Sequence, residues 1–226
     1  MTRVGSARHD ERGKLTGGKA GDQTGKEVSE QNFYVHSKGW FVLRPKSKEH
    51  AERIAERMRA ACKNTNIGYD QSNRLGVIKC GISSATPTEC DCSSLVRACI
   101  KEATLIDPGN FTTSNEKGTL LNTGLFQNIG AYRNGLSLYV GDVLVTKTKG
   151  HTVIVTEGAK REYTSFFPKC QNKTSFVDGL KEIGADSSKE YRATIAKKNG
   201  ISFYTGTASQ NTKLLNLLRE GKLIKP

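Results

Sequence analysis

The sequence has no apolar run long enough to cross a bilayer, so no transmembrane helix is expected. The segment from Met1 to Gly13 is polar and charged and lacks the apolar stretch of a secretory signal. Gly17–Gly25 is rich in glycine, but it has neither the Gly-Lys-Ser/Thr ending nor the preceding strand of a phosphate loop. No basic stripe with interleaved aromatic residues is present. We therefore expect neither a membrane nor a nucleic acid as the partner, and no nucleotide cofactor.

Charge is abundant and of one dominant sign, because the 226 residues carry a net charge of +13. Residues 160–226 contribute 13 Lys or Arg against 6 Asp or Glu, and the remaining excess is scattered over the first part of the chain. Such a balance favours a polyanionic partner, for which anionic cell-wall polymers and lipid surfaces serve as well as nucleic acid. The charge predicts adsorption and not specific recognition.

The six cysteines do not form a metal-binding pattern. They lie at positions 62, 80, 90, 92, 99 and 170. Synthesis without a signal peptide favours a reducing compartment, in which disulfides are rare. The C-x-C of Cys90 and Cys92 lacks the C-x2-C spacing of zinc sites, and no second ligand pair follows. We expect no metal and no cofactor.

One cysteine, Cys92, stands at the start of a predicted helix. Leu95, Val96, Cys99, Ile100 and Ala103 fall on one face at the 3.6-residue period, which predicts a helix over residues 93–105. The partial positive charge at a helix start favours a thiolate, and a nearby imidazolium favours it further. This position predicts a nucleophilic cysteine.

A predicted hairpin supplies one histidine. Gly141–Val145 and His151–Thr156 are typical of two strands joined by a turn. In the second strand, His151, Val153 and Val155 share one face. A helix that carries Cys92, packed on a small antiparallel sheet that carries His151, is an α+β fold.

The remaining elements are expected to serve the core. Residues 40–44 are predicted as a strand, and Ser47 is predicted to cap a helix that packs its apolar face on the core. Residues 1–32 are expected to form either a flexible arm or a loop pinned against the domain. Residues 110–138 are interpreted as loop with scattered apolar anchors.

The composition changes near residue 158, which predicts a second domain. We expect a first domain over 1–158, a linker over 159–173 and a small all-α domain over 174–226. Its three helices are predicted from Phe176 to Ile183, from the capping box Ser187-x-x-Glu190, and from the capping box Thr207-x-x-Gln210. No cluster of catalytic character is present there, so a binding module fits best.

The segments Asp91-Cys92-Ser93-Ser94-Leu95-Val96, Gly141-Asp142-Val143-Leu144 and His151-Thr152-Val153-Ile154-Val155 resemble the NlpC/P60 cysteine peptidases, which are related to CHAP domains. The whole chain is similar to endolysins of phages that infect clostridia-like Gram-positive hosts. The rest of this likeness is carried by residues 21–28 and 66–71 and by the tail, residues 204–226. The resemblance implies a papain-like core, followed by a helical module that binds the cell wall.

The resemblance also implies roles for single residues. Cys92 would attack an amide carbonyl, and His151 would act as general base and then as general acid. Tyr69, Asp91 and Ser93 would form the oxyanion-stabilising and substrate-binding surroundings. The family's third catalytic residue usually lies on the strand after the histidine, where this chain passes into the linker, which leaves Glu157, Glu162 or another residue open. The family often has Gly at the position of Ser94.

The resemblance implies peptidoglycan and anionic wall polymers as partners. We expect synthesis in the infected host's cytoplasm, release by a holin-like route and action on the wall. The scissile bond stays open between D-glutamyl–diamino acid, muramoyl–L-alanine and cross-bridge bonds, and the host species, the wall ligand and the oligomeric state are undetermined. The alternatives are a non-catalytic wall-binding protein with an inactive papain-like scaffold, and a papain-like acyltransferase or deamidase.

Overall fold

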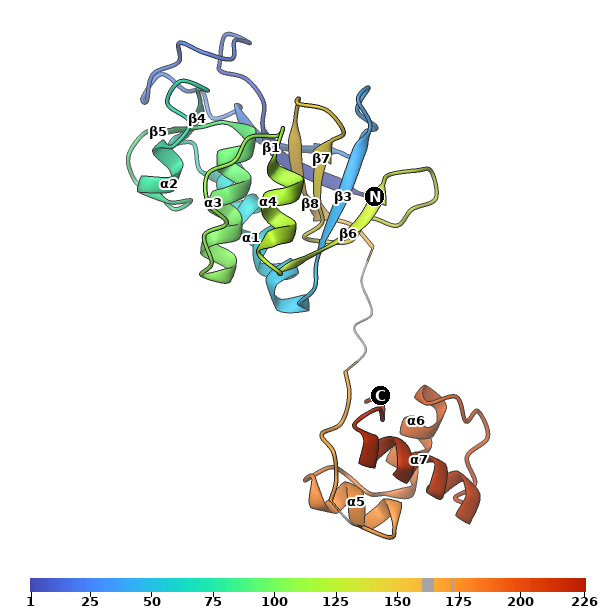
Figure 1. Ribbon diagram of the computed structural model, residues 1–226. Helices are drawn as coiled ribbons and strands as arrows, with labels where there is room; N and C mark the ends of the chain where they lie inside the picture. Colours follow the sequence, from blue (N-terminus) through green and yellow to red (C-terminus); the bar gives the residue numbers. More distant parts are fainter. Residues whose placement is uncertain (160–164, 172) are drawn as a thin grey trace. The chain divides into compact units, whose positions relative to one another are not determined.

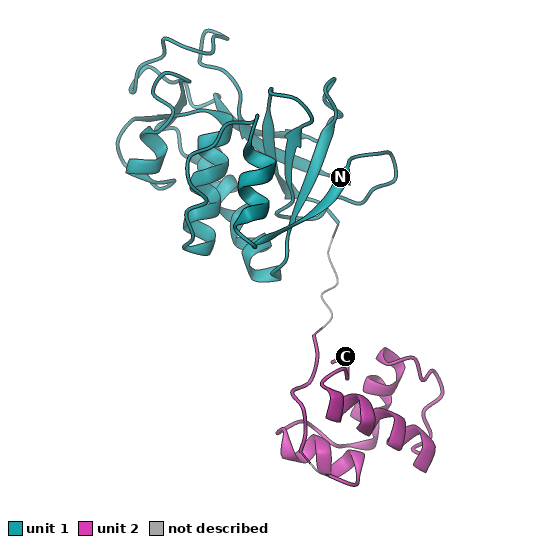
Figure 2. Ribbon diagram, viewed as in Figure 1, with its two compact units in different colours: residues 1–161 teal, residues 162–226 magenta. Residues whose placement is uncertain are grey.

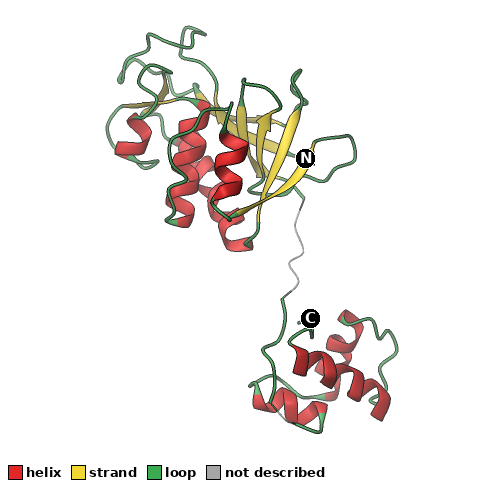
Figure 3. Ribbon diagram, viewed as in Figure 1, coloured by secondary structure: helices red, strands yellow, loops and turns green. Residues whose placement is uncertain are grey.

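The computed structural model describes residues 1–159, 165–171 and 173–226. It contains two compact units, Met1–Arg161 (unit 1) and Glu162–Pro226 (unit 2), which Figure 2 shows in two colours. Unit 1 combines helices with a sheet, and the described part of unit 2 is built around three helices (Figure 3). The predicted α+β fold class is confirmed. Within the described residues, no helix is both long enough and apolar enough to span a membrane.

Six strands form an antiparallel sheet in unit 1. The first of these strands along the chain pairs with the last one along the chain. The order across the sheet is β2-β1-β8-β7-β3-β6, and Figure 1 labels all of these strands except β2. The strand bounds are Arg3–Ala7 for β1, Val28–Asn32 for β2, Trp40–Pro45 for β3, Phe126–Ala131 for β6, Val143–Thr146 for β7 and Thr152–Glu157 for β8. Strands β1 and β8 change register after Arg3. The N-terminal residues are therefore part of the sheet and lie next to the strand that follows His151.

The two faces of this sheet pack on different sets of side chains, because residues along each strand alternate in direction. Val143, Val145 and Ile154 join the core that the sheet shares with the helices. Val153 and Val155 lie on the opposite face, in a smaller cluster with Trp40 and its neighbours. His151 has the parity of Val153, so its side chain belongs to this second face.

Two helices, α1 (Lys48–Lys63) and α3 (Cys92–Thr104), cover the first face of the sheet. Ser47 caps α1 as predicted, and its side chain accepts a hydrogen bond of 3.3 Å from the backbone N–H of His50. Asp91 caps α3, which begins one residue before its predicted start. A second, parallel two-stranded sheet, β4 (Ile67–Tyr69) with β5 (Thr88–Cys90), leads the chain into this cap. Between its strands lies α2 (Gly76–Cys80).

Three expectations about single segments were wrong. Residues 1–32 are neither arm nor loop throughout, because β1 and β2 are strands; their small and polar residues give little β signal. Residues 110–138 contain α4 (Glu116–Asn122) and β6, which are too short to show a clear period. The cap of the second C-terminal helix is Ser188, since its hydroxyl, and not that of Ser187, accepts from the Tyr191 N–H.

Unit 2 has its own buried core. Its helices are α5 (Phe176–Glu182), α6 (Lys189–Lys198) and α7 (Ala208–Glu220). The predicted capping box of Thr207 and Gln210 starts α7. The core consists of apolar side chains from all three helices and the segments around them: Phe167, Cys170, Phe176, Leu180, Ile195, Ala196, Leu214, Leu215, Leu218 and Leu223.

Candidate active site

The start of α3 is held by a dense local network around Asp91. One carboxylate oxygen of Asp91 accepts a 2.6 Å hydrogen bond from the Ser94 N–H, and the Ser94 hydroxyl accepts a 2.9 Å bond from the Asp91 N–H. Arg74 Nε donates to the other Asp91 oxygen at 2.6 Å. The Ser93 hydroxyl lies 3.3 Å from both oxygens. Asp91 and Ser93, expected near the substrate, thus fix the helix start in this structure.

Cys92 is the first residue of α3, and its side chain is almost completely buried, with 6% exposed. Backbone N–H groups of Thr152 and Ser93 donate to its sulfur, which favours the thiolate. Burial opposes them more strongly, and the charge of Asp91, with that of Glu116 when it is ionised, acts in the same direction as burial. Together these effects raise the pKa of Cys92 to about 12. The thiol is therefore protonated in this state.

His151 lies one residue before β8, on the face of the sheet that carries Trp40. Its Nε2 lies 3.2 Å from the Ser6 hydroxyl of β1, and its ring centroid is 6.4 Å from that of Trp40. Burial, with the nearby charges of Arg8 and His36, lowers the pKa of His151 to about 4. The imidazole is neutral at neutral pH.

The structure brings Cys92 against the strand of His151 through the backbone. The N–H that contacts the sulfur belongs to Thr152, the residue after His151. Within the described residues, no hydrogen bond joins the Cys92 thiol to the His151 ring, and no hydrogen bond engages His151 Nδ1. The two groups thus share one end of β8 without direct contact.

Tyr69 ends β4 and is buried. Its hydroxyl accepts a 3.0 Å hydrogen bond from the Gln71 side chain. Burial raises the pKa of Tyr69, against a smaller lowering by the Gln71 hydrogen bond. The expected helper therefore keeps its proton at neutral pH.

Sequence reasoning missed the residues that the N-terminal strands bring to this site. Ser6 contacts His151, and the charge of Arg8 acts on both His151 and Tyr34. Cys92 in turn acts on Tyr34. The parity of Val4, Ser6 and Arg8 places them on one face, but only the pairing of β1 with β8 shows which face it is. The sequence carried no signal for that pairing.

Glu157 and Glu162 are the two residues that the sequence analysis named as candidates for the third catalytic residue. Glu157 is exposed at the far end of β8. Glu162 lies outside the described residues. The six cysteines are free, and among the described residues no three His, Cys, Asp or Glu side chains gather in a way that could hold a metal ion.

Comparison with known proteins gives one finding. The family model of the endolysin-like domain matches residues 4–162, which include most of β1, Cys92 and His151. No curated protein and no solved structure matches the chain. The chain therefore belongs to the endolysin-like domain family, which supports a phage lytic function in general, with peptidoglycan as the substrate and the cell wall as the place of action.

Proposed function

We propose that the chain is a phage endolysin whose unit 1 is a cysteine peptidase or amidase of the NlpC/P60 type. The observation that carries the proposal is the position of Cys92 at the start of α3, with the Thr152 N–H at its sulfur and His151 next to Thr152. A thiol at a helix start, beside a histidine strand, is an arrangement suited to acyl transfer.

The reaction proceeds through a thioester. His151 takes the thiol proton as the Cys92 sulfur bonds to the carbonyl carbon of the scissile amide. Backbone N–H groups at the start of α3, with the Tyr69 hydroxyl, stabilise the oxyanion. The C–N bond then breaks as the leaving amine takes the proton from His151. Water hydrolyses the thioester, which releases a carboxylate and restores the thiol.

Ser6 is the third member of this site. Its hydroxyl lies 3.2 Å from His151 Nε2 and is fully buried. A partner on Nε2 fixes the tautomer and orientation of the ring and leaves Nδ1 for the thiol. A hydroxyl adds no charge, so it orients the imidazole without stabilising the imidazolium as a carboxylate would.

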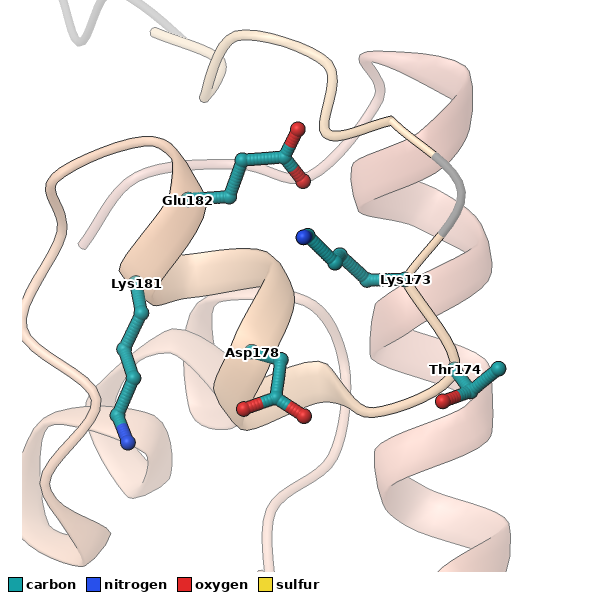
Figure 4. A pocket seen from close by; sticks show the side chains of 5 residues that line it. All are labelled: Lys173, Thr174, Asp178, Lys181 and Glu182. Carbon is teal, nitrogen blue, oxygen red and sulfur yellow. The ribbon is translucent and has the colours of Figure 1, made fainter.

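Unit 2 is proposed to bind the wall, in a chain divided into a catalytic domain over 1–158, a linker over 159–173 and a binding domain over 174–226. A hollow of about 470 Å³ is lined by Lys173, Thr174, Asp178, Lys181 and Glu182. Figure 4 shows the side chains of Lys173 and Glu182 directed toward one another, with Asp178 and Lys181 on the same helix as Glu182, α5. Lining groups of both charges suit a wall component that carries carboxylates and amines.

Synthesis in the host cytoplasm and release by a holin-like route complete the proposal. The scissile bond is one of the three classes named above, and muropeptide mass spectrometry identifies it.

A second candidate function is a non-catalytic wall-binding protein. The observation that favours it is the neutral pair: burial raises the pKa of Cys92 to about 12 and lowers that of His151 to about 4, and no hydrogen bond in the described chain joins the two side chains. Such a pair is inactive unless substrate binding brings the groups together.

Lysis of susceptible cells by the full chain separates the two functions. We expect Cys92→Ser to abolish lysis, while Cys80→Ser, at an exposed cysteine of α2, leaves it unchanged. Sedimentation of a 165–226 fragment with purified walls tests unit 2, which has its own core. Equal lysis by Cys92→Ser and wild type would contradict the peptidase proposal, and wall binding without any lysis by wild type would favour the second function.

A further inference from the structure

Glu116, at the first position of α4, is a buried carboxyl group for which the proposed reaction has no use. Its side chain is 0% exposed. One oxygen, Oε1, accepts a 2.6 Å hydrogen bond from the Thr152 hydroxyl. The other, Oε2, is buried and has no hydrogen-bond partner in the described part of the chain. A buried oxygen without a hydrogen-bond partner lowers the stability of the folded state, and a full negative charge on that oxygen lowers it further.

The same threonine links Glu116 to the proposed nucleophile. The Thr152 backbone N–H donates to the Cys92 sulfur, while its side chain donates to Glu116. Thr152 also follows His151 directly in the chain. A displacement of the Thr152 side chain therefore moves the N–H that faces the Cys92 sulfur. It also moves the backbone of His151.

Three elements contribute the titratable and polar groups around Glu116. Asp91 and Cys92 face it from the start of α3, and Asp91 is paired with Arg74. From β8 it meets the uncharged Thr152. On α4 itself, Lys117 lies over the Phe41 ring, with its Nζ 3.8 Å from the ring centroid, and is thereby directed to another partner.

We propose that Glu116 is a positioning residue that acts as a neutral carboxylic acid: it holds Thr152, and so the N–H at the Cys92 sulfur, and its ionisation opposes formation of the thiolate. This inference rests on the proposed function of Cys92 and assigns a regulatory role, dependent on pH, to a second buried acid at that site.

The electrostatics fit this role. Burial raises the pKa of Glu116 to about 8, against a smaller lowering by the Thr152 hydrogen bond, and Asp91 raises it as well. Below that pH the acid is neutral and adds no charge of its own against thiolate formation. Above it, the carboxylate adds a negative charge next to Cys92, on whose pKa Glu116 already acts in the raising direction.

The first test is the rate at which iodoacetamide alkylates Cys92 in the full-length protein between pH 6 and 10, followed on the Cys92 peptide by mass spectrometry. Only the thiolate reacts. We expect Glu116→Gln, which keeps an acceptor for Thr152, to react about tenfold faster than wild type above pH 8, which corresponds to a change of about one unit in the thiol pKa. Below pH 7 the two proteins should differ by less than about threefold.

Two further variants separate positioning from packing. Thr152→Val keeps the shape of the side chain and removes its hydroxyl, so lysis at pH 7 should fall about tenfold, the effect of one hydrogen bond. Glu116→Ala should cause a similar loss, and the double variant should lose no more than either single one, because both act through one contact. Glu102→Gln, at the other end of the Cys92 helix, is the matched control for the change of charge and should react like wild type.

The outcomes distinguish failure of this inference from failure of the proposed function. Identical alkylation profiles for wild type and Glu116→Gln would overturn the role of Glu116, even if lysis depends on Cys92. Additive losses in the double variant would overturn the coupling through Thr152. Lysis that persists in Cys92→Ala would overturn the proposed function alone, since the alkylation profile would still report the effect of Glu116 on the thiol.

Discussion

The two sides of the candidate site are built in different ways. The helix side, around Cys92, is held by residues within a few positions of each other and by Arg74. The sheet side joins His151 to Ser6, which lies 145 positions earlier, and Thr152 to Glu116. The helix side fixes the position of Cys92, the proposed nucleophile, whereas the sheet side holds the His151 ring and the Glu116 carboxyl group. Local sequence determines the first, and the pairing of distant segments determines the second.

The largest effect on stability is expected on the helix side. Asp91→Ala removes the cap of α3 and leaves Arg74 without its carboxylate, so we expect the free energy of unfolding of unit 1 to fall by about 3 kcal/mol. Urea unfolding followed by tryptophan fluorescence of Trp40 measures it. Ser47→Ala, which removes only the α1 cap, should cost about 1 kcal/mol. Equal losses in the two variants would show that the Arg74 pair contributes nothing.

A buried acid near the helix side should destabilise unit 1 at neutral pH. Glu89 is 1% exposed, both its oxygens are buried without partners among the described residues, and Glu27 lies nearby. Burial, with the charge of Glu27, raises the pKa of Glu89 to about 7. The folded state therefore holds this proton more tightly, and the resulting stability is present at pH 4 and lost as the pH rises through 7.

Glu89→Gln removes this dependence. We expect the variant to be more stable than wild type at pH 8, by on the order of 2 kcal/mol, and to match it near pH 4. Urea unfolding at both values measures the difference. A gain of the same size at pH 4 would show that ionisation is not its cause.

The sheet side should affect activity more than stability. Ser6→Ala removes the partner of His151 Nε2, so we expect lysis to fall about tenfold and stability by about 1 kcal/mol. Ser72→Ala, at an exposed serine outside β1 and β8, leaves that contact intact and is the control. Turbidity assays with susceptible cells report the rate. An unchanged rate in Ser6→Ala would remove Ser6 from the site.

The difference between the two sides also decides how much could be predicted. The apolar period from Leu95 to Ala103 and the alternation after His151 are local patterns, so the helix of Cys92 and its facing hairpin were predicted within one or two residues. The capping roles of Ser47 and Thr207 were predicted for the same reason.

The rest depends on contacts that no local pattern contains. Ser6 and Glu116 reach the site only because β1 pairs with β8 and the first residue of α4 accepts a hydrogen bond from Thr152 of that strand. The residues of β1 have a low propensity for strands, and α4 has only seven residues, too few to show a clear helical period. The pKa directions were also beyond prediction, because a helix start favours a thiolate while burial, which the sequence does not give, opposes it more strongly.

The central claim is that the Cys92 sulfur attacks the wall substrate. Purified peptidoglycan treated with the full-length protein should release new free amino groups, and Cys92→Ala should release none while unfolding at the same urea concentration as wild type. Release of amino groups by a folded Cys92→Ala variant at the wild-type rate would contradict the account.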